Sequence, residues 1–523
     1  MIKEYDINQD CGNSAILNQL LESGSIDVQA SPFLDCPPVS LDFPLSFDRF
    51  KAMMLGLAIG DSLGNTSEGM LPGVRRKKFG EIKDYLPARH SPSKIHLGYP
   101  SDDTQLAFWT LEQILTDGQL VMVNLADRFA RDRIFGIGKT VRRFLNNYHL
   151  GMPWQQCGIR SAGNGALMRI PSVIYPHLKS GSIDLWADTA LAAMLTHNDR
   201  SSTSACLSFV NMLWQLMQMD GLPKPTWWLT EYIKVASELE GQARLIRPRC
   251  VELSSWHGPL WKFVEEHVLS AWEDKLPILK AFDKWYSGAY LLETVPCALY
   301  ILMRHGHDFE EAMIRAVNDT KDNDTVAAIV GSAMGALHGI EAIPGRWIRN
   351  LSGRTSFRDD NQVFFLLEKA KQVYHECDFP EDIPYKQDLN QPVKMALVHI
   401  QTGALAGIAE MDVDYSKYTV RLRLPSNDII QEQFDPYFFF EAFEVIFNQL
   451  QFMGLALRVC GQCNYFGFSG LTAQFSQGTA GYCTVKLFAD GSRNHEGPAH
   501  VANYCYKFSY RKEHTSRSPF LPP

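Results

Sequence analysis

Two segments far apart in the chain begin with the same acidic pattern. Residues 101–109 read SDDTQLAFW, and residues 322–339 read DNDTVAAIVGSAMGALHG. Each segment places two carboxylates and a hydroxyl at the start of an apolar stretch that is typical of a helix. Each has an ordinary explanation when taken alone. Acidic side chains stabilise the positive end of a helix, and Ser101, Asp322 or Asn323 could cap the first turn.

The repetition of the pattern favours a metal site shared by the two segments. Adjacent Asp102 and Asp103 cannot both cap one helix, and Asp322 and Asp324 duplicate each other in the same way. If the two starts meet, each like-charged pair at 4 Å costs ~4 kcal/mol at an effective dielectric constant of 20. Cations must then balance the charge. Oxygen ligands select Mg²⁺, Mn²⁺ or Ca²⁺ rather than Zn²⁺.

Helices must position both acidic segments. Between residues 46 and 351 the apolar residues recur at spacings of three and four, and β-branched alternation is scarce. In FKAMMLGLAIGDSLG one stripe is formed by Phe50, Met53, Met54, Leu57 and Ala58. Similar stretches occur at 104–116, 120–130, 185–195, 202–219 and 309–317. This pattern predicts a mainly α-helical body.

The spacing of hydrophobic residues changes from helix-like to strand-like towards the carboxyl end, which predicts a multidomain chain. Strand-like alternation appears in VKMALVHI, YTVRLRLP and GYCTVKLFAD, while YFFFEAFEVIFNQLQFMG predicts a helix. Prolines mark the boundaries before the body and before these strands. We therefore expect an all-α domain followed by a smaller α+β domain. The predicted parts are an extension at 1–45, the helical domain at 46–375, a linker at 376–390 and the α+β domain at 391–523.

Composition excludes several classes of protein. With 523 residues and a formal charge of −8, the chain is long enough for two to four domains and too acidic for broad binding of nucleic acid or an anionic membrane. The first residues, MIKEYDINQD, lack the layout of a signal peptide, and no apolar run is long enough for a membrane helix. Eleven scattered cysteines do not indicate a disulfide scaffold. We expect a cytoplasmic protein.

Five motifs in order resemble the ADP-ribosylglycohydrolase family over residues 47–350. GLAIGDSLGNTSEGM resembles the opening helix and loop, and SDDTQLA resembles the first metal motif, with serine where threonine is commoner. SAGNGALMR resembles the glycine-rich substrate loop, and THND resembles the histidine motif that follows. The stretch from DFEEAMIRAV to GALHG resembles the second metal motif. No family resemblance is evident for residues 391–523.

The resemblance implies an all-α bundle that holds two divalent ions, Mg²⁺ or Mn²⁺, and hydrolyses the bond between ADP-ribose and its acceptor. The implied metal ligands are Ser101, Asp102, Asp103, Asp322, Asp324 and Thr325. The implied substrate contacts are Gly163, Asn164, Gly165 and His197, although a glycine triplet also suits a turn and a histidine also suits a core. Glu68 is the first candidate for proton transfer or for a movable metal ligand, with Asp103 as the alternative.

One departure from the family bears on the acceptor. Many members have two glycines just before the second metal motif, where this chain has Thr320 and Lys321. Lys321 could contact a phosphate or face solvent. The expected substrate is an ADP-ribosylated protein, and hydrolysis of a small ADP-ribose conjugate stays open. A rival hypothesis is an immunity-type protein that blocks an ADP-ribosyltransferase toxin. The extension at 1–45 could reach into such a partner or could be an arm packed loosely on the body.

Four cysteines near the carboxyl end could form a second metal site. They are Cys460, Cys463, Cys483 and Cys505. Four thiolates at such separations can surround Zn²⁺ or an iron–sulfur centre. Only the first pair has the C-x-x-C spacing, so buried free thiols and a redox pair stay open as alternatives.

Overall fold

The computed structural model describes most of the chain up to residue 375 and shorter stretches beyond it. The described residues are 12–39, 45–87, 97–242, 245–357, 359–375, 393–399, 405–414, 419–433, 446, 449–450, 453, 455–457, 466–467, 480–483, 486–487, 493–494 and 498–500. Contacts divide the chain into two units, residues 1–352 and 353–523. The predicted linker at 376–390 lies outside the described residues, so the predicted domain boundary stays a prediction.

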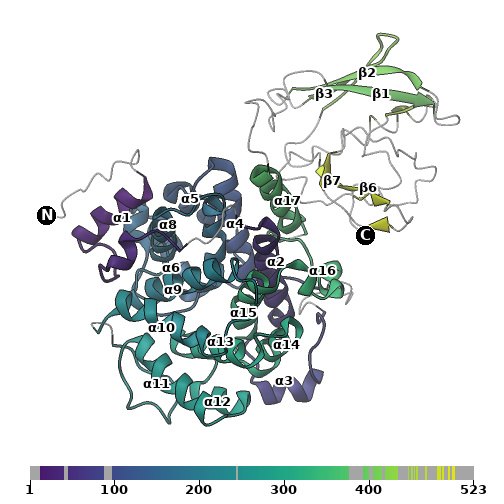
Figure 1. The fold of residues 1–523 in the computed structure, drawn as a ribbon. Helices are drawn as coiled ribbons and strands as arrows, with labels where there is room; N and C mark the ends of the chain where they lie inside the picture. Colours follow the sequence, from purple (N-terminus) through teal and green to yellow (C-terminus); the bar gives the residue numbers. More distant parts are fainter. Residues whose placement is uncertain are drawn as a thin grey trace. The chain divides into compact units, whose positions relative to one another are not determined.

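The first unit is built from helices (Figure 1). Its α-helices are α1 (Asn13–Glu22), α2 (Phe47–Asn65), α3 (Pro72–Phe79), α4 (Asp102–Asp117), α5 (Met122–Arg131), α6 (Lys139–His149), α7 (Trp154–Cys157), α8 (Asp184–Met194), α9 (Arg200–Leu216), α10 (Trp227–Glu240), α11 (Leu260–Glu273), α12 (Ile278–Trp285), α13 (Leu291–His305), α14 (Phe309–Asp319), α15 (Asn323–His338) and α16 (Gly345–Asn350). Short 3-10 helices are η1 (Pro32–Asp35), η2 (Leu167–His177) and η3 (Ile340–Ala342). The apolar spacing at three and four therefore predicted the fold class of this unit correctly.

Helices α2 and α15 lie against each other through glycines. A Cβ on Gly56 would lie 2.1 Å from the carbonyl oxygen of Gly331, and one on Gly60 would lie 2.1 Å from another carbonyl oxygen of α15. One turn further along α2, a Cβ on Gly64 would lie 2.3 Å from the backbone nitrogen of Asp324. Because these glycines recur every four residues, they share one face of α2. The two backbones touch there, and the end of α2 meets the start of α15.

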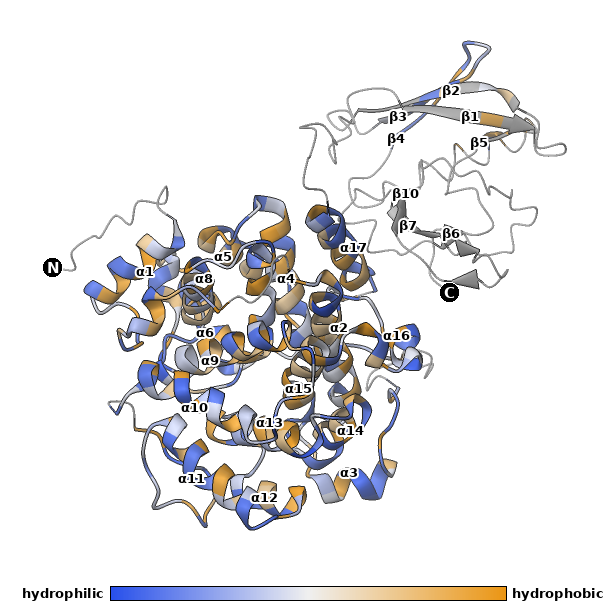
Figure 2. Cartoon of the chain, in the orientation of Figure 1, coloured by the Kyte–Doolittle hydropathy of each residue, from blue (hydrophilic) through white to orange (hydrophobic). Residues whose placement is uncertain are grey.

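The helices of the first unit differ in how hydrophobic their surfaces are. Helix α15 is hydrophobic along most of its length, whereas α10 and α11 alternate between hydrophobic and hydrophilic residues (Figure 2). This difference is expected when one helix is covered on all sides and the others have a face in solvent. Within the described residues, no helix combines the length and apolar character needed to span a bilayer.

Residues 12–39 of the predicted extension pack on the helical unit. Leu17 and Leu20 of α1 are buried. The indole N–H of Trp186 donates to the carbonyl of Cys36 at 2.7 Å, and the indole N–H of Trp214 donates to the carbonyl of residue 39 at 2.7 Å. This part of the extension is therefore attached to the body. Residues 1–11 and 40–44 lie outside the described residues.

The second unit contains a helix and antiparallel sheets. Its elements are α17 (Gln362–His375), β1 (Val393–His399), β2 (Leu405–Asp414), β3 (Thr419–Arg423), β4 (Ile429–Gln433), β5 (Leu455–Leu457), β6 (Phe466–Gly467), β7 (Ala480–Cys483), β8 (Lys486–Leu487), β9 (Arg493–Asn494) and β10 (Pro498–His500). The largest sheet has the order β4-β3-β2-β1-β5. Of the helix predicted at 437–454, the described residues Ile446, Gln449 and Leu450 are helical, and Ile446 and Leu450 are fully buried. The predicted α+β class is confirmed.

Candidate metal centre

The first acidic motif begins helix α4. Ser101 is the N-cap residue, and its hydroxyl accepts a hydrogen bond from the backbone N–H of Asp103 at 3.4 Å. The carboxylate of Asp61 on α2 holds the same helix start. It accepts from the backbone N–H groups of Ser101 at 2.9 Å and Thr104 at 3.0 Å, and from the Thr104 hydroxyl at 2.6 Å. Asp61 is fully buried, and its hydrogen bonds fix the turn that carries Asp102 and Asp103.

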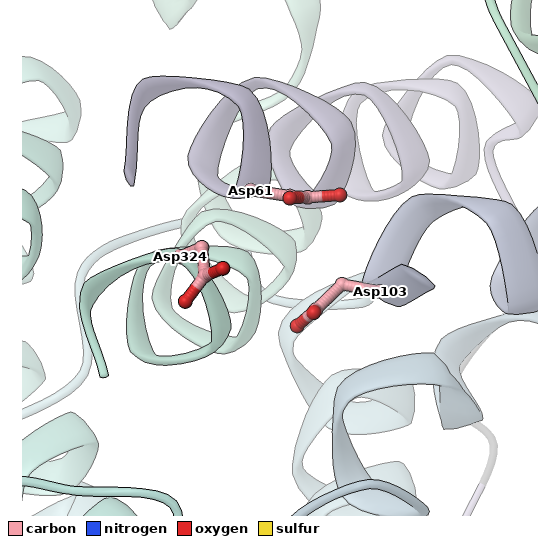
Figure 3. A group of neighbouring side chains, drawn as sticks. All are labelled: Asp61, Asp103 and Asp324. Atoms are coloured by element: carbon pink, nitrogen blue, oxygen red, sulfur yellow. The ribbon is translucent and has the colours of Figure 1, made fainter. Parts of the chain in front are cut away.

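Three buried carboxylates from three helices meet beside this turn. Asp61 of α2, Asp103 of α4 and Asp324 of α15 each offer an oxygen, and these oxygens lie within 4.8 Å of one another (Figure 3). The Oδ1 atom of Asp103 is buried and has no hydrogen-bond partner among the described residues. A buried polar atom without a partner costs about 1–3 kcal/mol. A cation at this point would remove that penalty.

A second group of carboxylates shares Asp324 with the first. Oxygens of Glu68, Asp322 and Asp324 also lie within 4.8 Å of one another. Asp322 and Asp324 are buried, whereas Glu68 is exposed in the turn after α2. The side-chain amide of Asn164 donates to Oδ2 of Asp322 at 2.6 Å and fixes that carboxylate. We call the two groups together with Asp102 the acidic cluster.

The pKa values show how strongly the cluster resists ionisation without a cation. Burial, followed by repulsion from Asp61, raises the pKa of Asp102 to about 8. Burial raises the pKa of Asp322 to about 7, against a lowering contribution from the Asn164 hydrogen bond. Burial and neighbouring carboxylates also raise the pKa values of Asp103 and Asp324 well above 3.8. An oxygen-only donor set with this excess of negative charge fits hard divalent cations such as Mg²⁺ or Mn²⁺.

A buried arginine joins the Glu68 turn to the second acidic motif. The Arg75 side chain of α3 is completely buried, and burial lowers its pKa to about 10. Its guanidinium donates to the carbonyl oxygens of Met70 at 3.0 Å and Thr320 at 2.6 Å, and to the Ser67 hydroxyl at 3.0 Å. These bonds connect the turn that carries Glu68 with the segment that precedes Asp322. Arg75 therefore fixes the spacing of the second group of carboxylates.

The glycine-rich loop lies against the predicted histidine. A Cβ on Gly163 would lie 3.5 Å from Nε2 of His197, and one on Gly165 would lie 3.0 Å from its Cε1. His197 is buried, and its Nδ1 lies 2.8 Å from the Thr196 hydroxyl. Burial, and then the charge of Arg169, lowers the pKa of His197 to about 3, so the ring is neutral near pH 7. A neutral ring can donate one hydrogen bond and accept another.

The structure brings the predicted metal-site residues together, while their roles as ligands stay predictions. Ser101, Asp102 and Asp103 occupy the start of α4, and Asp322, Asp324 and Thr325 occupy the start of α15. The Thr325 side chain opposes, by a smaller contribution, the rise that burial causes in the pKa of Asp103. Sequence reasoning missed Asp61. One feature of the sequence could have identified it. Asp61 is the only charged residue in the apolar run GLAIGDSLG, and a carboxylate in a buried helix needs a partner.

The predicted cysteine site falls largely outside the described part of the chain. Cys460, Cys463 and Cys505 lie outside the described residues, and for Cys483 only the backbone, in β7, is described. The Zn²⁺ or iron–sulfur site therefore stays a prediction. In the described part, Cys157, Cys206 and Cys297 are free and buried.

The region of the chain that contains the acidic cluster is similar to known proteins. A family model described as ADP-ribosylglycohydrolase matches residues 44–377. The ADP-ribosylarginine hydrolase Tri1 of Pseudomonas putida is 26% identical over 342 residues, which cover 63% of this chain and 80% of that protein. The ADP-ribosyl-(dinitrogen reductase) glycohydrolase of Rhodospirillum rubrum is 26% identical over 335 residues, covering 62% and 98%. The ADP-ribosylhydrolase ARH3 of Mus musculus is 23% identical over 332 residues, covering 59% and 88%.

Proposed function

Because the chain belongs to the ADP-ribosylglycohydrolase family, we propose that it removes ADP-ribose from a modified acceptor by hydrolysis, with Mg²⁺ or Mn²⁺ at the acidic cluster. A protein side chain is the acceptor class that we favour. The names of two relatives support it, since one is an ADP-ribosylarginine hydrolase and the other acts on ADP-ribosylated dinitrogen reductase. What the named relatives share is hydrolysis of an ADP-ribose linkage.

The observation that carries the proposal is the pair of carboxylate groups joined at Asp324. One group contains Asp61 and Asp103, and the other contains Glu68 and Asp322. A carboxylate has two oxygens, so Asp324 could serve both groups at once. When bound, divalent cations would supply positive charge to ribose hydroxyls and to the charge that develops as the glycosidic bond breaks.

The chain's own residues would hold the reacting groups and move the proton. The glycines of the GNG loop allow backbone N–H groups to approach a sugar or diphosphate closely. The side-chain amide of Asn164 donates to Asp322 at 2.6 Å and to the Thr294 hydroxyl at 2.9 Å, and these bonds hold the middle residue of the loop in place. Glu68 is the exposed carboxylate of the cluster and is our first candidate to accept a proton from water. Asp103 is fully enclosed and is the alternative.

A release assay tests the proposal. The purified chain with Mg²⁺ or Mn²⁺ should release free ADP-ribose from an ADP-ribosylated protein, and a chelator should stop the release. The variant D324N should lose release by at least 100-fold, because one residue serves both carboxylate groups. The matched control D220N changes an exposed aspartate in the loop before α10 and should keep full activity. Full activity of D324N would remove the basis of the proposal.

The same variant separates hydrolysis from the toxin-blocking hypothesis. A protein that only blocks a toxin would protect a target protein equally well with or without Asp324. The described residues 12–39 pack on the helical unit, which leaves them little freedom to reach a partner. Release from small ADP-ribose conjugates, without release from modified proteins, would instead support the small-conjugate hypothesis.

A further inference from the structure

Two cations and two tyrosines form a wall beside the acidic cluster. The Nζ atom of Lys321 lies 4.2 Å from the ring centroid of Tyr286 and hydrogen-bonds to its hydroxyl. The guanidinium of Arg249 lies 5.4 Å from the ring centroid of Tyr290 and 5.9 Å from that of Tyr286. Both distances are within the range of cation–π attraction. We call Arg249, Tyr286, Tyr290 and Lys321 the cationic wall.

The wall is fixed in place by buried polar groups. Both oxygens of Glu293, which is buried, accept from Arg249 at 2.7 Å, and one also accepts from the backbone N–H of Gly288 at 3.1 Å. Tyr286 has a φ of 75°, a value that is uncommon for residues other than glycine. The neighbouring carbonyl of Ser287 accepts from the backbone N–H of Lys321 at 3.1 Å. These contacts hold the wall in one arrangement.

The wall lies between the two loops expected to contact the scissile bond. The carbonyl of Lys321 accepts from the backbone N–H of Gly69, the residue after Glu68, at 3.0 Å. On the other side, Tyr290 pairs with Gly163 of the glycine-rich loop. Lys321 also directly precedes Asp322. The wall therefore borders the place where an acceptor would leave.

The exposed parts of the wall carry positive charge. Tyr286 is 38% exposed, the Arg249 side chain is 54% exposed, and Lys321 is half-buried. The negative groups nearby include Glu293, which is already paired with Arg249, the exposed Glu252, and the acidic cluster itself, which the proposed cations would balance. In the described part of the chain, the Lys321 ammonium contacts the ring and hydroxyl of Tyr286 and no carboxylate. These contacts leave the positive charge of Lys321 without a balancing carboxylate among the described residues.

We propose that the cationic wall selects an acceptor that departs as an anion, with a carboxylate side chain of a protein in first place; this inference rests on the proposed hydrolase function. In the reaction, the bond from the ribose C1″ to the acceptor oxygen breaks, and its electron pair stays on that oxygen. A water oxygen bonds to C1″ and gives up one proton. The products are ADP-ribose, a carboxylate and a proton. A fixed cation beside the departing oxygen stabilises the charge that develops.

The same wall disfavours an arginine acceptor, because its guanidinium would meet the like charge of Lys321, whereas the charge of Arg249 is balanced by Glu293. A phosphate acceptor would share the anionic chemistry. We place it second, because the chain's net charge of −8 opposes binding of a nucleic acid that carries a terminal phosphate. The lysine that replaces the usual glycine thus has a role in acceptor choice.

The test compares four substrates and three variants. The substrates are peptides with ADP-ribose on glutamate, arginine or serine, and an oligonucleotide with ADP-ribose on its terminal phosphate. The variants are K321Q, which removes the charge, K321R, which keeps it, and the matched control K262Q on α11, where the Lys262 side chain is 47% exposed. Tm is measured for each variant, and spontaneous ester hydrolysis is subtracted.

The expected result is a kcat/KM at least 10-fold higher for the glutamate ester than for the arginine linkage. K321Q should lower the kcat for the ester about 10-fold and change arginine release less than threefold, while K321R and K262Q should keep the wild-type ratio. A preference for arginine, for serine or for the phosphate-linked oligonucleotide, or a ratio that K321Q leaves unchanged, would each overturn the inference. Absence of release from all four substrates would overturn the proposed function itself.

Discussion

Replacing Gly64 by alanine should separate the two helices at the acidic cluster. The added Cβ would lie 2.3 Å from the nitrogen and 2.4 Å from the Cα of Asp324, whereas ordinary contacts begin at 3.4 Å. The backbones must therefore move apart by about 1 Å. Overpacking of this kind costs about 1–3 kcal/mol. We expect the upper end for G64A, because the obstructing atoms belong to backbone that cannot rotate away.

The loss should appear both in stability and in metal binding. At roughly 2–4 °C per kcal/mol, a destabilisation of ~3 kcal/mol lowers Tm by roughly 6–12 °C. A cation at 100 times its Kd stabilises a folded protein by about 2.7 kcal/mol. Ligand distances tolerate only about 0.2 Å. A shift of about 1 Å at Asp324 should therefore abolish most of the rise in Tm that Mg²⁺ or Mn²⁺ gives the wild type.

Two matched variants separate steric cost from damage to the cluster. In G56A the new Cβ would lie 2.1 Å from the carbonyl oxygen of Gly331, about 12 Å further along the same helix pair. G56A should lose comparable stability but keep more of the metal-dependent rise. Gly73 has nothing within 4 Å of its Cβ position, so G73A should gain roughly 0.5–1 kcal/mol. Thermal unfolding with and without metal measures all three. If G64A keeps the full metal-dependent rise in Tm, the contact between Gly64 and Asp324 does not set the geometry of the acidic cluster.

Three further predictions follow from the cluster. The raised pKa values of Asp102 and Asp322, about 8 and 7, mean that the metal-free folded state binds more protons than the unfolded state above pH 4. Metal-free stability should therefore fall as pH rises from about 4 to 8, and Mg²⁺ should remove most of this slope in urea titrations. E68Q should lower kcat by roughly 100- to 10,000-fold, with little loss of Tm because Glu68 is exposed; an unchanged kcat would exclude it from proton transfer. R75M should lower Tm by several degrees and weaken metal binding measured by calorimetry, because it leaves buried carbonyls without donors. Unaltered metal affinity would show that Arg75 does not set the spacing of the carboxylates.

The sequence predicted those features that have a local signal. Helices such as α4 and α9 follow from apolar periodicity, since a helix with one buried face repeats every three or four residues. The two acidic helix starts were visible for the same reason. Their meeting point was not, because the pairing of Gly64 with Asp324 depends on contacts across more than 250 positions of sequence.

Two functional residues were missed for related reasons. Arg75 stands in the run RRKK, which is typical of a solvated surface, and only the packing of α3 shows that it is the buried member. Asp61 has no second acidic residue near it in the sequence that would mark it as part of a motif. Its hydrogen bonds to Ser101 and Thr104 are therefore evident only from the structure. The exposure of Glu68 likewise depends on where the turn after α2 lies.

The glycine contact between α2 and α15 also bears on how the chain folds. Helix α2 leaves the ribosome early, but the partner for its glycine face follows more than 250 residues later. Contacts of such long range form slowly and leave apolar surface open in the meantime. The nascent chain cannot assemble the cluster until α15 has been synthesised. A shortened chain that ends before residue 323 should therefore need chaperones and should acquire no divalent cation, however much is present in the cell.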